Sequence, residues 1–169
     1  MEIKASQVKE LRDMSGVAMM ECKKALVECE GNIEKALDLL RSNSSLKAEK
    51  KASRVAADGV IRIIATDNYA TIIEINSETD FAAKDAGFIA FADEVATFIT
   101  NNKMNNAEEF LNTEIEEKRL SLVQTIGENI QLRRIETIDF NSSMSVGSYI
   151  HSDGKLATLV VTDSSESEL

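Results

Sequence analysis

Apolar side chains recur at three- and four-residue steps through about the first forty residues, a spacing typical of amphipathic helices. The first helix is expected to begin at Ser6, which is a good N-cap residue, and to end near Ser15-Gly16. Val8 and Leu11 form its apolar edge. A short helix with one apolar edge predicts packing against neighbouring helices.

The same spacing of apolar residues predicts two more helices. The second is predicted over residues 18–29 and is stopped by Gly31, and the third begins at Asn32 as its N-cap. The residues expected on their buried faces are Ala18, Cys22, Ala25, Leu26 and Cys29 in the second helix and Ile33, Ala36, Leu37 and Leu40 in the third. The three helices predict a compact bundle over residues 1–43.

Beyond the bundle the hydrophobic period changes. Residues 44–55 are polar, with basic residues at helical steps, and predict a solvated helical linker. After Asp58-Gly59 the pattern becomes that of strands and then returns to helix from Asp85. The expected strands are 60–66, 69–76, 129–138, 146–151 and 155–162; the expected helical segments are 107–111, 114–127 and the one from Asp85, with Phe88, Phe91, Ala92, Val95 and Ile99 on its buried face.

This order of elements predicts an α+β protein, a helical module followed by an antiparallel sheet with packed helices. The expected divisions are a bundle at 1–43, a linker at 44–55, a core subdomain at 56–140 and the start of a second core subdomain at 141–169. The last stretch, 163–169, has the polar and acidic composition of a helix N-terminus with no helix behind it, so the architecture is expected to stop part-way.

Charge and composition narrow the classes of partner. The net charge is −10 and is uneven: residues 1–54 carry eleven basic and nine acidic residues, and the remainder eight basic and twenty acidic. Nucleic acid is therefore not expected as the main partner, because binding to phosphate needs clustered Lys and Arg. The start has no signal-peptide pattern and no run is long enough to span a bilayer, so we expect a cytoplasmic protein with no membrane contact.

Residues suited to catalysis are scarce. The only histidine is His151, and glycine-rich phosphate loops and nucleophile elbows are absent from the sequence. Cys22 and Cys29 are seven apart, which is not a zinc-ligand spacing, and we expect them to be reduced thiols. We therefore expect neither an enzyme nor a cofactor or metal. A metal-dependent hydrolase remains a rival, since Glu74, Glu78 and Asp80 could hold a divalent ion.

Two features bear on binding. In the second helix, Met20 and Val27 lie opposite the buried stripe, with Met19 at its edge, and predict either an adaptable contact surface or packing against the following domain. The second feature is Ser77–Lys84, which joins a strand to a helix, so Thr79 or Asp80 is expected to cap that helix. If the helix starts early, Phe81, seven residues before Phe88, points into the core.

Several blocks together resemble the elongation factor Ts (EF-Ts) family, in family order and over essentially the whole sequence. They are Val8–Leu26, Ala56–Val60, Asn76–Gly87 with its Thr-Asp-Phe segment, Ile126–Ile130 with Arg133-Arg134, and Gly147–His151 with Gly154-Lys155. The resemblance implies a UBA-like N-terminal bundle and a guanine nucleotide exchange factor that binds the GTPase EF-Tu during translation elongation.

The resemblance also implies roles for particular positions. Asp80 and Phe81, framed by Thr79 and Ala82, would enter the EF-Tu nucleotide domain near its magnesium site and weaken the binding of metal and phosphate. The positions matching Arg12, Met19 and Met20 would contact a helix of the same GTPase domain. His151 matches an interface histidine, although a solvent-exposed histidine on an edge strand is an equal alternative.

Departures from the family pattern leave the Asp-Phe pair intact. Ala82 stands where valine is usual, Ser15–Ala18 replaces a common Thr-Gly-Ala-Gly, and Ala157 replaces a glycine. Most family members continue with a second core half and further helices that contact another EF-Tu domain or form a homodimer. A homodimer is therefore a weaker expectation here, and an adaptor that binds a protein through the helical bundle without exchange activity remains the alternative function.

Overall fold

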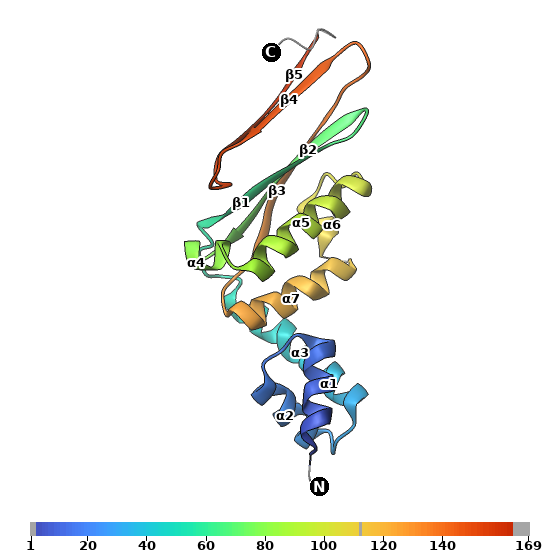
Figure 1. The fold of residues 1–169 in the computed structure, drawn as a ribbon, viewed down its shortest axis with the longest axis vertical. Coiled ribbons are helices and arrows are strands. Elements are labelled where there is room, and N and C mark those ends of the chain that lie inside the picture. Colours follow the sequence, from blue (N-terminus) through green and yellow to red (C-terminus); the bar gives the residue numbers. More distant parts are fainter. Residues whose placement is uncertain (1–2, 112, 164–169) are drawn as a thin grey trace. The chain divides into compact units, whose positions relative to one another are not determined.

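A computed structural model describes residues 3–111 and 113–163 of the chain (Figure 1). The chain divides into two compact units, one formed by Met1–Arg54 with Glu116–Asn129 and the other by Val55–Ile115 with Ile130–Leu169. We refer to them as the helical unit and the sheet unit. The helical unit is therefore assembled from two separate stretches of sequence.

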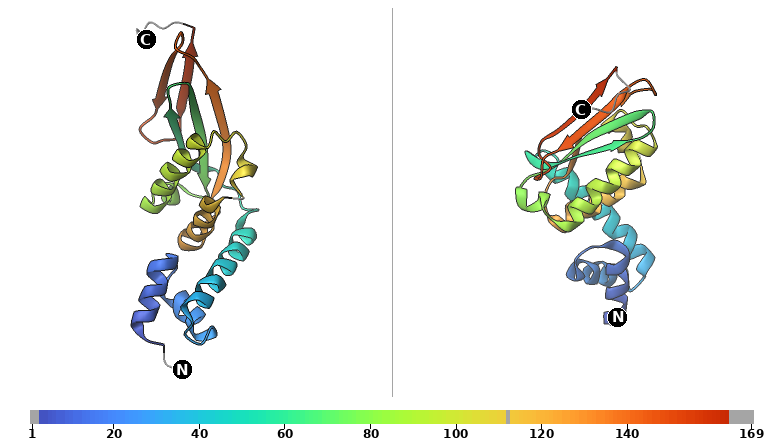
Figure 2. Two further views of the ribbon diagram at one scale, coloured as in Figure 1. Left: turned by 90° about the vertical axis from the view of Figure 1, so that its right-hand side faces the viewer. Right: turned by 45° about the horizontal axis from the view of Figure 1, so that its top comes forward.

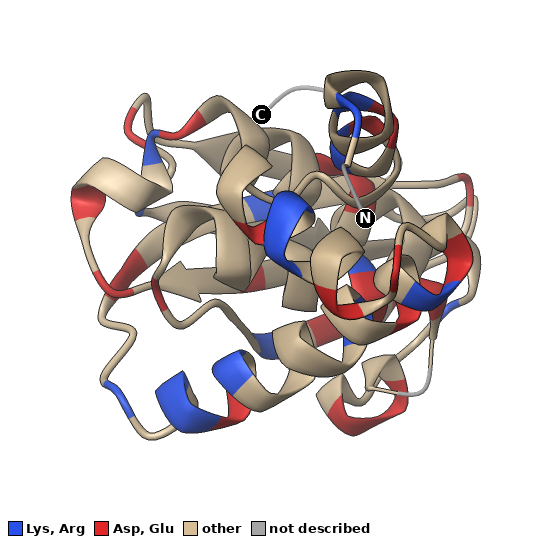
Figure 3. Cartoon of the chain, turned by 90° about the horizontal axis from the view of Figure 1, so that it is seen from below, with Lys and Arg blue, Asp and Glu red and all other residues tan. Residues whose placement is uncertain are grey.

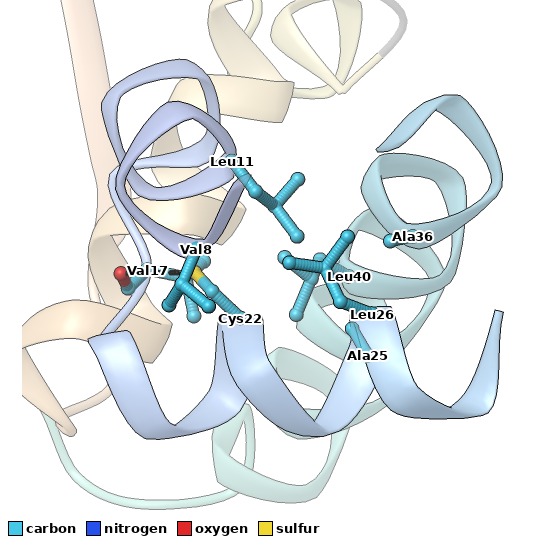
Figure 4. Packing of buried hydrophobic residues seen from close by; sticks show 8 residues of the cluster. All are labelled: Val8, Leu11, Val17, Cys22, Ala25, Leu26, Ala36 and Leu40. Atoms are coloured by element: carbon cyan, nitrogen blue, oxygen red, sulfur yellow. Dashed lines mark hydrogen bonds between the residues drawn. The ribbon is translucent and has the colours of Figure 1, made fainter. Parts of the chain in front are cut away.

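The helical unit contains the three predicted helices and a fourth from later in the chain. Its elements are α1 (Ala5–Ser15), α2 (Met19–Glu28), α3 (Ile33–Lys51) and most of α7 (Glu114–Ile126). Figure 4 shows the apolar side chains that meet between α1, α2 and α3: Val8, Leu11, Val17, Cys22, Ala25, Leu26, Ala36 and Leu40. The predicted buried faces of the second and third helices are thereby confirmed at their central positions, while Ile33, Leu37 and Cys29 are half-buried.

Two details of the helix starts were wrong. Helix α1 begins one residue before Ser6, with Lys4 at the N-cap, because the Gln7 side-chain oxygen accepts a hydrogen bond from the Lys4 amide at 3.1 Å and so replaces the expected serine cap. Ala18 is an exposed N-cap of α2 and not part of its buried stripe. Asn32 does cap α3, accepting from the Lys35 amide at 3.0 Å.

Helix α7 is tied to the N-terminal helices by polar contacts. The Ser121 hydroxyl donates to the Ser15 carbonyl at 3.0 Å, and the Lys51 ammonium donates to the Gly127 carbonyl at 2.6 Å. Much of the stretch predicted as a linker is the second half of α3, in which Ser44 and Ala48 are buried. The partners of the later segment, Glu116–Asn129, within the helical unit therefore lie far from it in sequence.

The sheet unit is built on three antiparallel strands in the order β1-β2-β3: β1 (Asp58–Ala65), β2 (Tyr69–Ser77) and β3 (Gln131–Asp139). Helices α4 (Asp80–Ala83), α5 (Ala86–Asn101) and α6 (Ala107–Phe110) follow β2 along the chain. The strands β4 (Ser145–Ile150) and β5 (Ala157–Thr162) form a separate two-stranded antiparallel sheet. Figures 1 and 2 show α5 along one face of the three-stranded sheet and the β4-β5 hairpin on the other side.

The core of this unit lies between α5 and the sheet. All five residues predicted on the buried face of that helix are buried, as are the strand residues Ile73, Ile75 and Ile135, and α5 packs against β1 and β2. Asp85 begins α5 by accepting hydrogen bonds from the Gly87 and Phe88 amides. The α+β class is confirmed. The stretch 164–169, in which we expected the start of a helix, lies outside the described residues.

Candidate functional site

The segment that leaves β2 forms a single helical turn, α4, whose start is set by Thr79. Thr79 has extended backbone angles, and its hydroxyl oxygen accepts a hydrogen bond from the Ala82 amide at 3.3 Å, which is N-cap geometry. The Thr79 carbonyl in turn accepts a hydrogen bond from the Ser77 hydroxyl at 3.1 Å. The predicted cap is confirmed, and it joins the turn to the last residue of β2.

Phe81 points away from the protein. Its side chain is 83% exposed, whereas the next two residues, Ala82 and Ala83, are buried and anchor the turn. The alternative that Phe81 enters the core is therefore wrong. It assumed one continuous helix to Phe88, but α4 ends at Ala83 and Asp85 starts a new helix with its own cap, so the seven-residue spacing does not place both rings on one face.

Asp80 and Lys84 form an ion pair across the same turn. The Lys84 ammonium lies 2.7 Å from the Asp80 carboxylate, and this hydrogen bond lowers the pKa of Asp80 below its ordinary value. The charges of Lys84 and Lys155 act in the same direction, while Asp58 opposes them. The site thus presents an ionised carboxylate next to an exposed aromatic ring.

A second ion pair lies close to α4. The Lys155 ammonium is 2.7 Å from Asp58, the first residue of β1, and this contact lowers the pKa of Asp58 and raises that of Lys155. Lys155 belongs to the turn between β4 and β5, which begins at His151. His151 therefore lies just beyond the end of β4 and not within a strand as predicted. Its imidazole is 49% exposed, with Nδ1 3.0 Å from Asp153 Oδ1.

Glu74, one of the three acidic residues of the rival metal site, is paired with two arginines. Its carboxylate accepts hydrogen bonds from Arg134 at 2.7 Å and Arg133 at 3.2 Å. Neighbouring strand residues normally point to opposite faces, but a bulge opposite Glu74 and Ile75 lets both arginines reach one carboxylate. In the described part of the chain no three His, Cys, Asp or Glu side chains lie close enough to share a metal ion, so the rival reading as a metal-dependent hydrolase loses its site.

The Glu74 cluster has a consequence for pH. Burial raises the pKa of Glu74, but the hydrogen bond and charge of Arg134, with help from Asn76 and Arg133, outweigh it and hold the pKa below the ordinary 4.5. Because the folded pKa is depressed, the stabilisation is present above pH 4.5 and is lost as the pH falls through the folded value.

We therefore predict that Glu74→Gln lowers the free energy of unfolding by about 1 kcal/mol at pH 7. The difference from the natural protein should shrink below pH 4.5. Urea unfolding at a series of pH values measures it, and a difference that grows on acidification would contradict the assignment.

The helical unit carries an exposed apolar surface on α1 and α2. Met20 is 66% exposed and Val27 59%, and Met19 is also exposed, so the predicted outward residues do lie on the surface of their own unit. Arg12 is exposed on α1. Met14 on α1 is a further exposed methionine, which was not among the residues predicted for this surface.

The structure thus distributes the candidate residues over both units. The sheet unit contains Thr79, Asp80, Phe81, Ala82 and His151. The charge of Lys155, which belongs to the same turn as His151, lowers the pKa of Asp80, and Asp80 in turn raises the pKa of Lys155. The residues Arg12, Met19 and Met20 belong to the helical unit.

Figure 3 shows acidic and basic positions interspersed along the ribbons. None of the helices described is long and apolar enough to cross a membrane.

Comparison with known proteins gives consistent matches. A family model described as "Elongation factor TS" matches residues 78–169. The elongation factor Ts of Hahella chejuensis is 47% identical over 169 residues, which is 99% of this chain and 58% of that protein. The elongation factors Ts of Saccharophagus degradans and of Haemophilus influenzae strain PittGG are 47% and 48% identical and cover 100% and 99% of this chain. The chain spans 58–59% of the length of these curated relatives.

Proposed function

Because the chain belongs to the elongation factor Ts family, we propose that it acts as a guanine nucleotide exchange factor for the GTPase EF-Tu in the cytoplasm. The observation that carries the proposal is the exposed Asp80–Phe81 pair on the one-turn helix α4. A ring that is 83% exposed contributes little to its own fold, whereas an aromatic anchor in a partner's pocket is a common source of binding energy.

In the proposed mechanism the two side chains have different tasks. The Phe81 ring enters an apolar pocket of the GTPase beside its nucleotide site, and burying it supplies roughly 2–3 kcal/mol. That binding energy drives the insertion of the adjacent Asp80 carboxylate. The carboxylate disturbs the magnesium ion and the phosphates electrostatically. The binding of exchange factor and of GDP then become mutually unfavourable, and this coupling is reciprocal.

The contacts that hold the α4 turn in place determine whether this insertion can occur. Thr79 closes the N-terminus of α4, and Ala82 is buried against the sheet unit, so Asp80 and Phe81 project from a turn held at both ends. The valine-to-alanine departure at position 82 places a smaller side chain in a buried site and leaves the exposed pair unchanged. Because the turn is already held in place in the free protein, its insertion does not require a loop to fold on binding, which lowers the entropic cost of association.

The helical unit contributes a second contact in this proposal. Met19 and Met20 provide a flexible apolar surface, and Arg12 supplies a charge beside it, for a helix of the GTPase domain. These contacts add to the affinity, and Asp80 and Phe81 also set the rate of nucleotide release. The chain changes no covalent bond in this scheme, so the proposed function is that of a binding protein without a catalytic residue or cofactor of its own.

The decisive experiment uses EF-Tu loaded with a fluorescent GDP analogue. Adding the chain in the presence of excess unlabelled GDP should accelerate release, with a rate that rises and then saturates with the concentration of the chain. An unchanged rate at saturating concentration would refute exchange activity. If immobilised chain then captured EF-Tu without affecting release, the adaptor alternative would be supported, a function favoured by the exposed methionines of α1 and α2.

A further inference from the structure

The turn between β4 and β5 is fastened to the first strand of the other sheet. The Ile61 amide donates to the Gly154 carbonyl at 2.7 Å, and a Cβ at Gly154, whose φ is +70°, would lie 3.6 Å from the Val60 side chain. Beside this contact the Lys155 ammonium donates to the Asp58 carboxylate at 2.8 Å. One backbone bond and one ion pair thus hold the turn at the start of β1.

Within the turn, His151 is held by the same residues. Its amide donates to the Leu156 carbonyl at 2.8 Å, and its carbonyl accepts from the Gly154 amide at 2.8 Å. The Asp153 carboxylate contacts the His151 ring at 3.0 Å and accepts from the Lys155 amide at 3.1 Å. The position of the imidazole is therefore linked to that of Lys155.

Asp58 connects the turn to α4. It pairs across the β1-β2 ladder with Ser77, and the Ser77 hydroxyl donates to the carbonyl of Thr79, the N-cap of α4. A continuous set of contacts therefore runs from Lys155 through Asp58 and Ser77 to the residue that precedes Asp80. It lies entirely within the sheet unit.

We propose that the Asp58–Lys155 ion pair is a positioning device that holds the His151–Lys155 turn beside the Asp80–Phe81 pair, so that both are presented to the GTPase together. Neither residue of the ion pair is assigned a contact with the partner. The inference rests on the proposed exchange function and deepens it, because it predicts that charge pairing away from the inserted residues controls the maximal rate of nucleotide release.

The test is a charge swap. Asp58→Lys and Lys155→Asp should each lower the maximal rate of GDP release by about threefold or more, the range expected for loss of an ion pair near the surface. The double variant, in which the charges are exchanged, should recover most of the rate, and Lys155→Arg should retain it. The half-saturating concentration should change less than the maximal rate, since the apolar contacts are untouched.

A matched control is available at the opposite end of the same sheet. Lys103 and Asp139 are also 2.7 Å apart and exposed, and Lys103→Glu should leave release unchanged. Should a reversal lower the thermal midpoint, Lys155→Gln and Asp58→Asn test the same loss without like charges. Single variants that match the natural chain, or a double variant no better than either single one, would overturn the inference. Failure of the natural chain itself to speed release would instead refute the proposed function.

Discussion

Replacing Phe81 by alanine is expected to lower the rate of GDP release from EF-Tu about thirtyfold or more while leaving the fold intact, as for a binding hot spot of at least ~2 kcal/mol. The physical reason is the 83% exposure of the ring, which has little contact to lose in the free protein. Substitutions at such positions change the free energy of unfolding by about 0.5 kcal/mol or less. Stopped-flow release and thermal unfolding of one preparation measure both effects.

The control for this variant is another exposed apolar residue of the sheet unit. Leu111 is 56% exposed, and Leu111→Ala should alter neither the release rate nor the thermal midpoint. Comparable losses of stability and of release in the Phe81 variant would mean that the ring supports its own fold, and the proposed mechanism would then lose its main support.

Phe88→Ala should show the reverse behaviour. Phe88 is fully buried between α5 and the sheet, and removing a buried phenylalanine ring costs about 3–5 kcal/mol through lost burial and the cavity that remains. The sheet unit should unfold at a markedly lower temperature and urea concentration. Release should fall only in proportion to the fraction unfolded.

Circular dichroism during urea unfolding measures the loss, and release assayed at low temperature, where the variant is folded, provides the comparison. Phe88→Leu is the matched variant, because it keeps most of the apolar volume and should cost much less. A Phe88→Ala protein as stable as the natural chain would contradict the burial, and one that is folded but inactive would place Phe88 in the binding surface.

The two phenylalanines also show what the sequence could and could not establish. The period of three and four residues correctly identified Phe88, Phe91 and Val95 as one buried face, because a long amphipathic helix repeats its signal. Phe81 was ambiguous, since its environment depends on a break at residues 84–85 and not on any repeat. Among the features of the sequence, only the resemblance to the family favoured an exposed ring.

The contacts that position the site could not be predicted from sequence patterns. Lys155 and Asp58 are separated by 97 positions, and α7 joins helices from more than a hundred residues earlier through contacts such as Ser121 to Ser15. Such pairings depend on the tertiary arrangement of distant segments. The local periodicity of a sequence carries no information about that arrangement. The bulge that gathers Arg133 and Arg134 around Glu74 is similarly invisible, because alternation predicts opposite faces for the two arginines.

The division of the helical unit between two sequence stretches has a consequence for synthesis. On the ribosome, α1, α2 and α3 emerge early, but Ser121 and Gly127, which meet Ser15 and Lys51, follow only after β1, β2 and α5 have been made. The N-terminal helices already share an apolar core of their own, but they gain their polar contacts to residues 121–127 only once the intervening segment has been translated. The helical unit is thus completed only after Val55–Ile115 of the sheet unit has been made.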